Sequence, residues 1–420
     1  MAEPARLQPI EPRPQGEAAA RPDGGGRVPA ITIQVFAETP EVAAAAEAAG
    51  ADRRLARAHL TVQTGGMAAA TELYRRQASP HLIMVESSAD EDALIAALDR
   101  LADVCEATTK VVVIGASNDI RLYRELLDRG VSEYLLAPVD AMQLVATAAR
   151  LYRDSGAERL GRAFAFIGAK GGAGSSTVAH NVAWAVAREL STDIVLADLD
   201  MPFGTASLDF NMDAAQGVAE AIQDAGRLDE VLLERLLAKH DDHLSLLAAP
   251  TGLDRSYDLD ESAFDRLLDL VQASVPFLIL DVPHLWCAWA KKTLVSADEV
   301  VVTAEPDLAS LRNAKNLVEF LGRARPNDPP PKLVVNQVGM PKRPEIKPAD
   351  FAAALQLEPA ACIAFDPATF GAAANKGQMV GEVAARSRAA GAFTELAQTI
   401  TGRRPPQRRS GFSLGRLLGR

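Results

Sequence analysis

The residues best suited to chemistry lie in one glycine-rich loop, which reads GAKGGAGSST over positions 168–177. An apolar run ends just before the loop and a helical pattern starts at Val178, so the predicted order is strand, glycine loop, helix. Glycines let successive backbone N–H groups turn toward one anion, and the start of the helix adds its positive end. The loop is therefore predicted to hold phosphate groups through Gly171, Gly172, Ala173, Gly174, Ser175, Ser176 and Thr177.

This loop departs from the usual phosphate-binding pattern in one respect. The usual pattern has a lysine directly before the Ser or Thr that binds Mg²⁺, and here that position is Ser175. The lysine of this loop comes early, at Lys170. A glycine-rich turn that only joins a strand to a helix is the alternative interpretation.

Two aspartates follow apolar runs of their own. Asp200 comes shortly after the run 194–197, and Asp281 directly follows the run 277–280. Mg²⁺ with phosphate ligands usually keeps several waters and takes only one or two protein carboxylates. Strand-end aspartates also cap helices, but beside a phosphate-binding loop the pattern favours a metal role for both.

A parallel sheet is needed to bring these residues together. From position 163 onward, six mostly apolar runs are separated by helical stretches, as expected when both faces of a parallel sheet are buried. The predicted strands are 163–167, 194–197, 244–248, 277–280, 300–303 and 333–335, with helices at 261–273 and 308–321 among the connections. Such a doubly wound sheet binds ligands at the carboxyl ends of its strands, where the loop and both aspartates fall.

The loop resembles the deviant Walker A loop of the MinD/ParA ATPases, which carries one lysine early and a second before the Ser or Thr. In that family the early lysine reaches the nucleotide of the partner in a dimer. This chain keeps the first lysine and lacks the second, and in this it is similar to the CpaE/TadZ branch, which places Flp/Tad-type pilus machinery in bacteria. The resemblance implies ATP and Mg²⁺ as cofactors and a homodimer that forms on ATP binding.

The same resemblance assigns roles to single residues. It implies that Lys170 acts in trans and that Asp200 positions the attacking water, so these two are the expected catalytic residues. Ser176, Asp200 and Asp281 are expected to hold Mg²⁺, directly or through water. Asn336 and Asp366 occupy places that frame the adenine ring in MinD-like proteins, and the segment 336–346 resembles the CpaE pattern.

The first part of the chain has a second pattern of alternating strands and helices. Its predicted strands are 31–36, 60–62, 82–85, 111–114 and 134–136, and the arrangement resembles a response-regulator receiver domain. A working receiver has acids after its first strand, an aspartate after its third, a hydroxyl after its fourth and a lysine after its fifth. Here these places read Ala37-Glu38, Glu86, Ala116-Ser117 and Ala137-Pro138. Because the lysine is absent and the acceptor is a glutamate, we expect a docking pseudo-receiver rather than a phosphorylatable switch.

The predicted fold class is therefore α/β, with two domains. A receiver-like, flavodoxin-like domain over 30–153 is followed by a doubly wound, mostly parallel P-loop NTPase domain over 160–402. Residues 1–29 are expected to be a disordered leader. The tail 403–420 contains six arginines and no acid, and is either a short amphipathic segment that contacts anionic membrane or a solvated basic end.

Composition and charge argue against a nucleic-acid-binding, membrane-spanning or secreted protein. The formal net charge of −11 argues against broad nucleic-acid binding, because that binding depends on neutralising phosphates. No apolar run reaches the roughly 18 residues of a membrane span, and the first residues do not read as a secretory signal. The three cysteines are odd in number and widely spaced, so neither a disulfide nor a cysteine metal site is expected, and the chain is predicted to be cytoplasmic.

These observations predict an ATP-binding, ATP-dependent dimerising protein with slow ATPase activity, acting in Flp/Tad-type pilus assembly as a polar localisation factor. Its expected partners are a second copy of itself and the pilus machinery, either a secretion ATPase or a polar landmark. Peripheral contact with the anionic inner membrane is a further expectation. A nucleotide-bound scaffold that does not hydrolyse ATP and a ParA-type partition ATPase are the alternatives.

Overall fold

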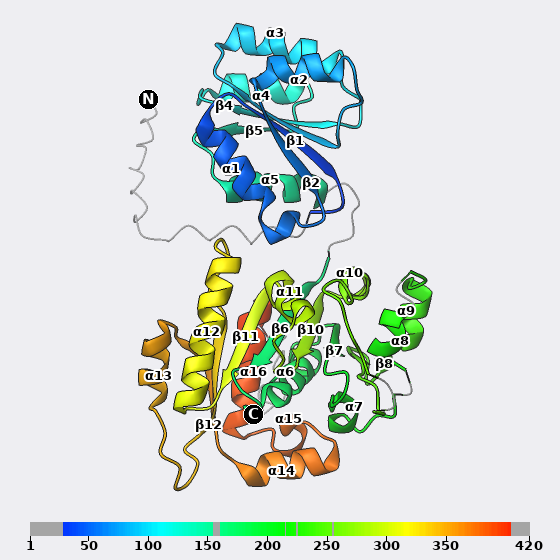
Figure 1. Cartoon of the computed structure of the whole chain (residues 1–420), viewed down its shortest axis with the longest axis vertical. Helices are drawn as coiled ribbons and strands as arrows, with labels where there is room; N and C mark the ends of the chain where they lie inside the picture. Colours follow the sequence, from blue (N-terminus) through cyan, green and yellow to red (C-terminus); the bar gives the residue numbers. More distant parts are fainter. Residues whose placement is uncertain (1–27, 154–159, 215, 224–225, 254–255, 405–420) are drawn as a thin grey trace, which may run out of the picture. The chain divides into compact units, whose positions relative to one another are not determined.

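The structure is a computed structural model that describes residues 28–153, 160–214, 216–223, 226–253 and 256–404. The chain forms two compact units, residues 1–157 and 158–420. In each unit a mostly parallel sheet is built from strands that alternate with helices along the chain (Figure 1). The predicted α/β fold class is confirmed. Most of the predicted leader and tail lie outside the described residues.

The first unit contains a five-stranded parallel sheet in the order β2-β1-β3-β4-β5. Its strands are β1 (Thr32–Ala37), β2 (His59–Thr64), β3 (Leu82–Ser87), β4 (Lys110–Gly115) and β5 (Glu133–Leu136). Its helices are α1 (Pro40–Gly50), a 3₁₀ turn (Arg53–Leu55), α2 (Gly66–Tyr74), α3 (Glu91–Ala102), α4 (Ile120–Asp128) and α5 (Ala141–Arg153). This strand order is flavodoxin-like, and one apolar cluster includes α1 and α5 while the other includes α2, α3 and α4.

The acidic corner of the first unit consists of Glu38 and Glu86, and both carboxylates accept hydrogen bonds from within the unit. Glu86, at the end of β3, accepts from the backbone N–H groups of Glu38 and Thr39 at 2.7 and 2.8 Å and from the Thr39 hydroxyl at 2.7 Å. In return, Glu38 accepts from the N–H and hydroxyl of Ser88 at 2.8 and 2.7 Å. Both carboxylates are thus engaged in joining the loop after β1 to the end of β3.

We expect beryllofluoride with Mg²⁺, which mimics an acyl phosphate, to leave hydrogen exchange at residues 38–39 and 86–88 of the full chain unchanged. The reason is that both carboxylate oxygens of Glu86 already accept hydrogen bonds. Glu86→Ala is the positive control, because it removes that acceptor and should speed exchange at the same amides. Mg²⁺-dependent protection in the wild type at these positions would show that the corner is a working phosphorylation site.

The second unit contains an eight-stranded sheet in the order β13-β12-β11-β6-β10-β7-β9-β8. All neighbouring strands are parallel except β8 and β9. The strands are β6 (Arg162–Gly168), β7 (Ile194–Asp198), β8 (Ala238–Lys239), β9 (Leu244–Leu247), β10 (Phe277–Val282), β11 (Glu299–Ala304), β12 (Lys332–Val338) and β13 (Pro359–Ala364). Strand β6 lies between β11 and β10, so the loop that follows it emerges near the middle of the sheet.

Helices cover both faces of this sheet (Figure 1). They are α6 (Ser175–Glu189), α7 (Ala206–Asp209), α8 (Val218–Gln223), α9 (Glu230–Leu236), α10 (Asp265–Ser274), α11 (Ala288–Ser296), α12 (Leu308–Ala324), α13 (Pro348–Leu355), α14 (Pro367–Lys376), α15 (Val380–Val383) and α16 (Arg388–Thr401). Side chains of β6 alternate between the two apolar cores: Phe164 and Phe166 face the core that contains α6 and α16, and Ala163, Ala165 and Ile167 face the other. Two-sided burial explains why β6 is a continuous apolar run.

Two strands of this sheet were not predicted. Strand β8 has two residues and pairs antiparallel with β9 at one edge, and β13 forms the other edge. Strand β13 reads PAACIA, mostly small residues rather than the Val, Ile, Leu and Phe of the inner strands, and only its Ile363 is buried. No helix within the described ranges is long and apolar enough to cross a membrane.

Candidate nucleotide site

The glycine-rich loop borders a cleft of about 930 Å³ at the carboxyl ends of β6, β7 and β10. The cleft is lined by residues 168, 170–177, 199–203, 256, 257, 259, 282–285 and 289. All predicted phosphate-binding residues of the loop, together with Lys170 and Asp200, are therefore in one cavity. Asp281 is 3% exposed and lies next to this lining, one residue before Val282.

Helix α6 presents an uncapped start to the cleft. Gly174, in the left-handed region at φ 85°, is its N-cap and offers no side-chain cap. The first backbone N–H groups of any helix have no partner within the helix, and here they belong to Ser175, Ser176 and Thr177. These donors and the positive end of the helix suit an anion such as a phosphate.

Four side chains hold the carbonyl oxygens of the loop from outside it. His284 Nδ1 is 2.9 Å from Gly168 O, and because a carbonyl only accepts, Nδ1 is the donor. Amide groups donate to the other three carbonyls: Asn313 to Ala169 at 2.9 Å, Gln337 to Gly172 at 3.1 Å and Asn336 to Ala173 at 2.9 Å. These bonds fix the shape of the loop. Among its own N–H groups, Ala169 donates to Thr303 at 2.8 Å and Ala173 to Lys170 at 3.3 Å, so the donors left for a ligand include those at the start of α6.

Lys170 is held by acids of its own chain. Its Nζ lies 2.6 Å from Asp307 and 3.3 Å from Glu305, both in the segment after β11. The hydrogen bond to Asp307 is the main cause that raises the pKa of Lys170, with partial burial acting against it. Burial alone would raise the pKa of Asp307, but Lys170 and the N–H of Ser310 outweigh it and lower that pKa. Lys170 therefore carries a positive charge at neutral pH.

Asp200 and Asp198 shape the turn after β7. The Asp200 carboxylate accepts from Phe203 N–H at 3.2 Å, and its burial raises its pKa. Asp198 is fully buried and accepts from the N–H groups of Asp200 and Ala206, each at 3.1 Å. Burial, and next the charge of Asp281, raise the pKa of Asp198 to about 7.

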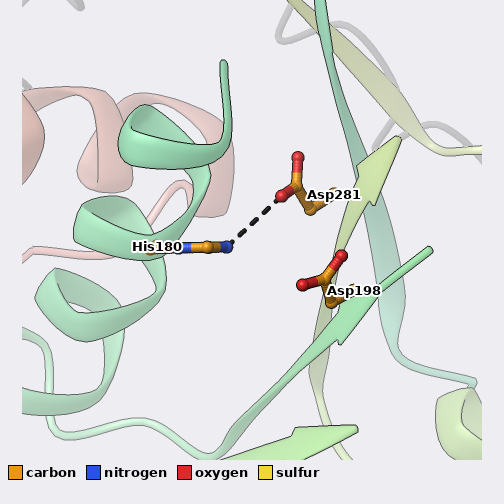
Figure 2. A group of neighbouring side chains, drawn as sticks. All are labelled: His180, Asp198 and Asp281. Carbon is orange, nitrogen blue, oxygen red and sulfur yellow. Dashed lines mark ion pairs between the residues drawn. The ribbon is translucent and has the colours of Figure 1, made fainter. Parts of the chain in front are cut away.

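A buried histidine faces the two strand-end aspartates (Figure 2). His180, on α6, is fully buried, with Nδ1 2.7 Å from Asp209 Oδ2 and Nε2 3.3 Å from Asp281 Oδ2. The second contact is an ion pair by distance, although its geometry is not that of a hydrogen bond. Burial alone would lower the pKa of His180, but Asp209 and Asp281 outweigh it and raise the pKa to about 10. His180 is thus an imidazolium at neutral pH.

Besides Asp281, two predicted site residues do not line the cleft. Asn336 is 7% exposed and lies behind the loop, with its amide nitrogen bound to Ala173. Asp366 is the N-cap of α14 and accepts from Thr369 N–H at 3.0 Å. The expectation that these two residues contact adenine stays a prediction.

The residues that sequence reasoning missed are His180, Asp198, Asp209, His284, Glu305 and Asp307. Asp198 stands two positions before Asp200, so the Asp-Leu-Asp spacing was a usable signal. His180 gave a weaker one: it is a single ionisable residue on the buried face of α6, which otherwise packs as Val178, Ala179 and Val182. The partners of Lys170 lie more than 130 positions away, and nothing local indicates them.

The donor set fits a nucleotide with Mg²⁺. The loop offers backbone N–H groups, and the Ser175 hydroxyl oxygen is buried without a hydrogen-bond partner among the described residues. Ser176 supplies a second hydroxyl, and Asp200 and Asp281 supply carboxylate oxygens, the ligand type that Mg²⁺ prefers. When bound, Mg²⁺ would neutralise charge on the phosphates.

Known proteins resemble this chain in sequence and in fold. A family model described as an AAA domain matches residues 161–329. The septum site-determining protein MinD of Synechocystis is 26% identical over 153 residues, which are 36% of this chain and 56% of that protein. The ParA family ATPase of Chlorobium tepidum has a TM-score of 0.52 at 22% identity, over 56% of this chain and 98% of that one, and shares the fold.

A pilus assembly protein CpaE from Caulobacter crescentus is 48% identical to this chain, over 30% of this chain and 96% of the solved one, with a TM-score of 0.29. The 48% identity over nearly the whole of that relative shows the family. This chain is of the CpaE type. The ParA and MinD structures show that it shares their fold. The chain spans little more than half the length of the MinD relative.

In this CpaE-type chain, Gly174→Ala should lower the free energy of unfolding of the second unit by about 1–3 kcal/mol. The added Cβ would lie 2.4 Å from Asn336 Nδ2 at a residue whose φ is +85°. The measurement is denaturant unfolding. Gly171→Ala is the matched control in the same loop, because a Cβ there meets nothing within 4 Å; equal losses in the two variants would contradict the role given to Asn336.

Proposed function

We propose that this chain binds ATP with Mg²⁺, forms a homodimer in the ATP-bound state and turns ATP over slowly. The observation that carries the proposal is a glycine-rich loop that borders the cleft and leads into the uncapped start of α6, with Ser175 where the usual lysine would stand. Lys170, Ser176, Asp200 and Asp281 take the roles that the resemblance implies. Asn336 and Asp366 are proposed to lie on the adenine side.

We further propose that the dimer acts in Flp/Tad-type pilus assembly as a polar localisation factor. The name of the CpaE relative, a pilus assembly protein, supports this role. The partners would be a secretion ATPase or a polar landmark, reached from the cytoplasm, with the basic tail contacting the anionic inner membrane. A net charge of −11 disfavours a partition ATPase that binds DNA.

The decisive experiment sizes the full chain by analytical ultracentrifugation with ATP, ADP and no nucleotide, and measures phosphate release in the same samples. The proposal requires a dimer with ATP and slow release of phosphate. A dimer with no release would identify a nucleotide-bound scaffold. A monomer under all three conditions would overturn the dimer proposal.

Lys170→Ala should bind nucleotide but remain a monomer with ATP, because the proposed trans contact is lost. Asp307→Asn should have the opposite effect and reach half-dimer at an ATP concentration about two- to fivefold lower. The reason is that Lys170 must leave Asp307 to reach a partner, and a partly exposed pair contributes about 0.5–1 kcal/mol.

The Asp307 variant is well controlled. Asn is as good an N-cap as Asp, so α12 keeps its cap. Glu319→Gln removes an exposed carboxylate from the same helix and does not touch Lys170. Sedimentation of Asp307→Asn identical to wild type, or a dimer of Lys170→Ala, would remove the support for an intermolecular lysine.

Ser175→Lys should raise turnover at saturating ATP and Mg²⁺. A charge about 4 Å from the phosphates is worth roughly 1–4 kcal/mol, which corresponds to about 5- to 1000-fold in rate if it acts on the transition state. Ser175→Met is the matched control, since it adds similar length without charge. Phosphate release is measured for these variants and for Asp200→Asn in parallel. A fast wild-type rate that Asp200→Asn leaves unchanged would refute both the slow turnover and the water-positioning role of Asp200.

A further inference from the structure

His180 joins two parts of the cleft that are far apart in sequence. Its ring lies on α6, five positions after the helix begins at Ser175, and it touches Asp209 with one nitrogen and Asp281 with the other. Asp209 ends the short helix α7, and Asp281 belongs to β10. Figure 2 shows the ring of His180 pointing at Asp281, with Asp198 beside it.

Both ring nitrogens face carboxylate oxygens, and an ionised carboxylate only accepts hydrogen bonds. The 2.7 Å contact of Nδ1 with Asp209 is a hydrogen bond, whereas the 3.3 Å contact of Nε2 with Asp281 has the distance of an ion pair without the geometry of a hydrogen bond. No part of the ring is exposed to water. A buried charge is tolerated when opposite charges surround it, and removing one member leaves the others unpaired.

Asp209 also contacts the loop that carries Asp200. The Thr205 hydroxyl donates to Asp209 Oδ2 at 3.3 Å, the same oxygen that lies 2.7 Å from His180 Nδ1. Thr205 is the N-cap of α7 and directly precedes Ala206, whose N–H donates to Asp198. The position of the loop after β7 is in this way linked through one imidazolium to the aspartate at the end of β10.

We propose that His180 is a positioning residue, which orients Asp281 toward Mg²⁺ and ties it to the loop that bears Asp200. This inference rests on the proposed function, because it concerns the metal of that site. His180 does not line the cleft, so it acts on a bound ion only through the aspartates.

The experiment measures two affinities of the full chain separately. ADP binding is measured in EDTA, and Mn²⁺ binding to the ADP complex is measured by the EPR signal of the free ion. In His180→Asn the side-chain amide takes the place of Nδ1, keeping a donor for Asp209 and losing the contact with Asp281. Loss of such a partner of a metal ligand typically costs 10- to 100-fold in metal affinity, so Mn²⁺ binding should weaken by that factor while ADP affinity in EDTA stays within about twofold.

His180→Gln is the companion variant. Its amide takes the place of Nε2 and can donate to Asp281, so Mn²⁺ affinity should fall less than in His180→Asn. Asp209→Asn tests the other contact: its amide oxygen still accepts from the ring but carries no charge, and Mn²⁺ binding should again weaken with ADP binding in EDTA unchanged. Circular dichroism melts of all three variants identify any that are unfolded, and the inference then rests on the remaining ones.

Unchanged Mn²⁺ affinity in His180→Asn would overturn the positioning role, and unchanged affinity in Asp209→Asn would overturn the link to the loop. A parallel loss of ADP affinity in EDTA would show a general structural role instead. Stoichiometric zinc in the purified wild type that disappears in His180→Asn would make His180, Asp198 and Asp281 a metal centre, which also overturns the proposal. Failure of the wild type to bind ADP would count against the proposed function. The outcomes above test only the role of His180 and leave the proposed function standing.

Discussion

The constraint on which the site depends is the burial of two carboxylates side by side. Asp198 and Asp281 occupy paired positions on the neighbouring strands β7 and β10, and both are at most 3% exposed. Burial and the charge of Asp281 raise the pKa of Asp198. The charge of His180 acts in the opposite direction and offsets part of this effect. Helix α6 therefore does two things at once: its first turn offers N–H groups to a phosphate, and its second turn balances the acids at the strand ends.

The phosphate-binding loop is shaped by residues that are distant in sequence. Its carbonyl oxygens are bound by amides from α12 and β12 and by an imidazole after β10. The segment 336–346, which resembles the CpaE pattern, contributes two residues besides Asn336. Gln337 holds the loop from a left-handed backbone conformation, and Arg343 bonds both to the Gln337 carbonyl and, at 2.7 Å, to Glu305. Through Glu305, the same segment reaches the ion pair of Lys170, so the loop geometry and the position of its lysine depend on one set of contacts.

Much of the fold could be predicted from the sequence, because strands buried on both faces are apolar throughout. All six strands predicted for the second unit are present, and α12 starts at the predicted Leu308. The edge strand β13 was not found this way, since it consists mostly of small residues with weak strand preference and only Ile363 is buried. Helix α10 starts at Asp265, later than predicted, and there Asp260 accepts hydrogen bonds from both the N–H and the hydroxyl of Ser262. Local side-chain bonds of this kind compete with a helical start.

The candidate site could be predicted only in part. Residue type and strand ends indicated the loop, Asp200 and Asp281, which the fold brings to one cavity and its border. The partners of His180 and Lys170 could not be predicted, because each contact depends on the packing of separate elements. Asn336 shows the difference: its place at the end of a strand was foreseeable, but the carbonyl to which it donates, 163 positions earlier, was not.

The arrangement of charges explains why tight binding and slow turnover belong together in the proposed function. The one lysine of the loop is paired with Asp307 and Glu305, so the loop itself offers a nucleotide mainly backbone dipoles. Those dipoles contact phosphates in the ground state and in the transition state alike, and such uniform binding raises affinity without raising the rate. Acceleration needs charge that acts where negative charge develops. In the proposed function that charge would come from Mg²⁺ and from a lysine that leaves its acids for a second copy, so the formation of the dimer, rather than the loop, would set the rate.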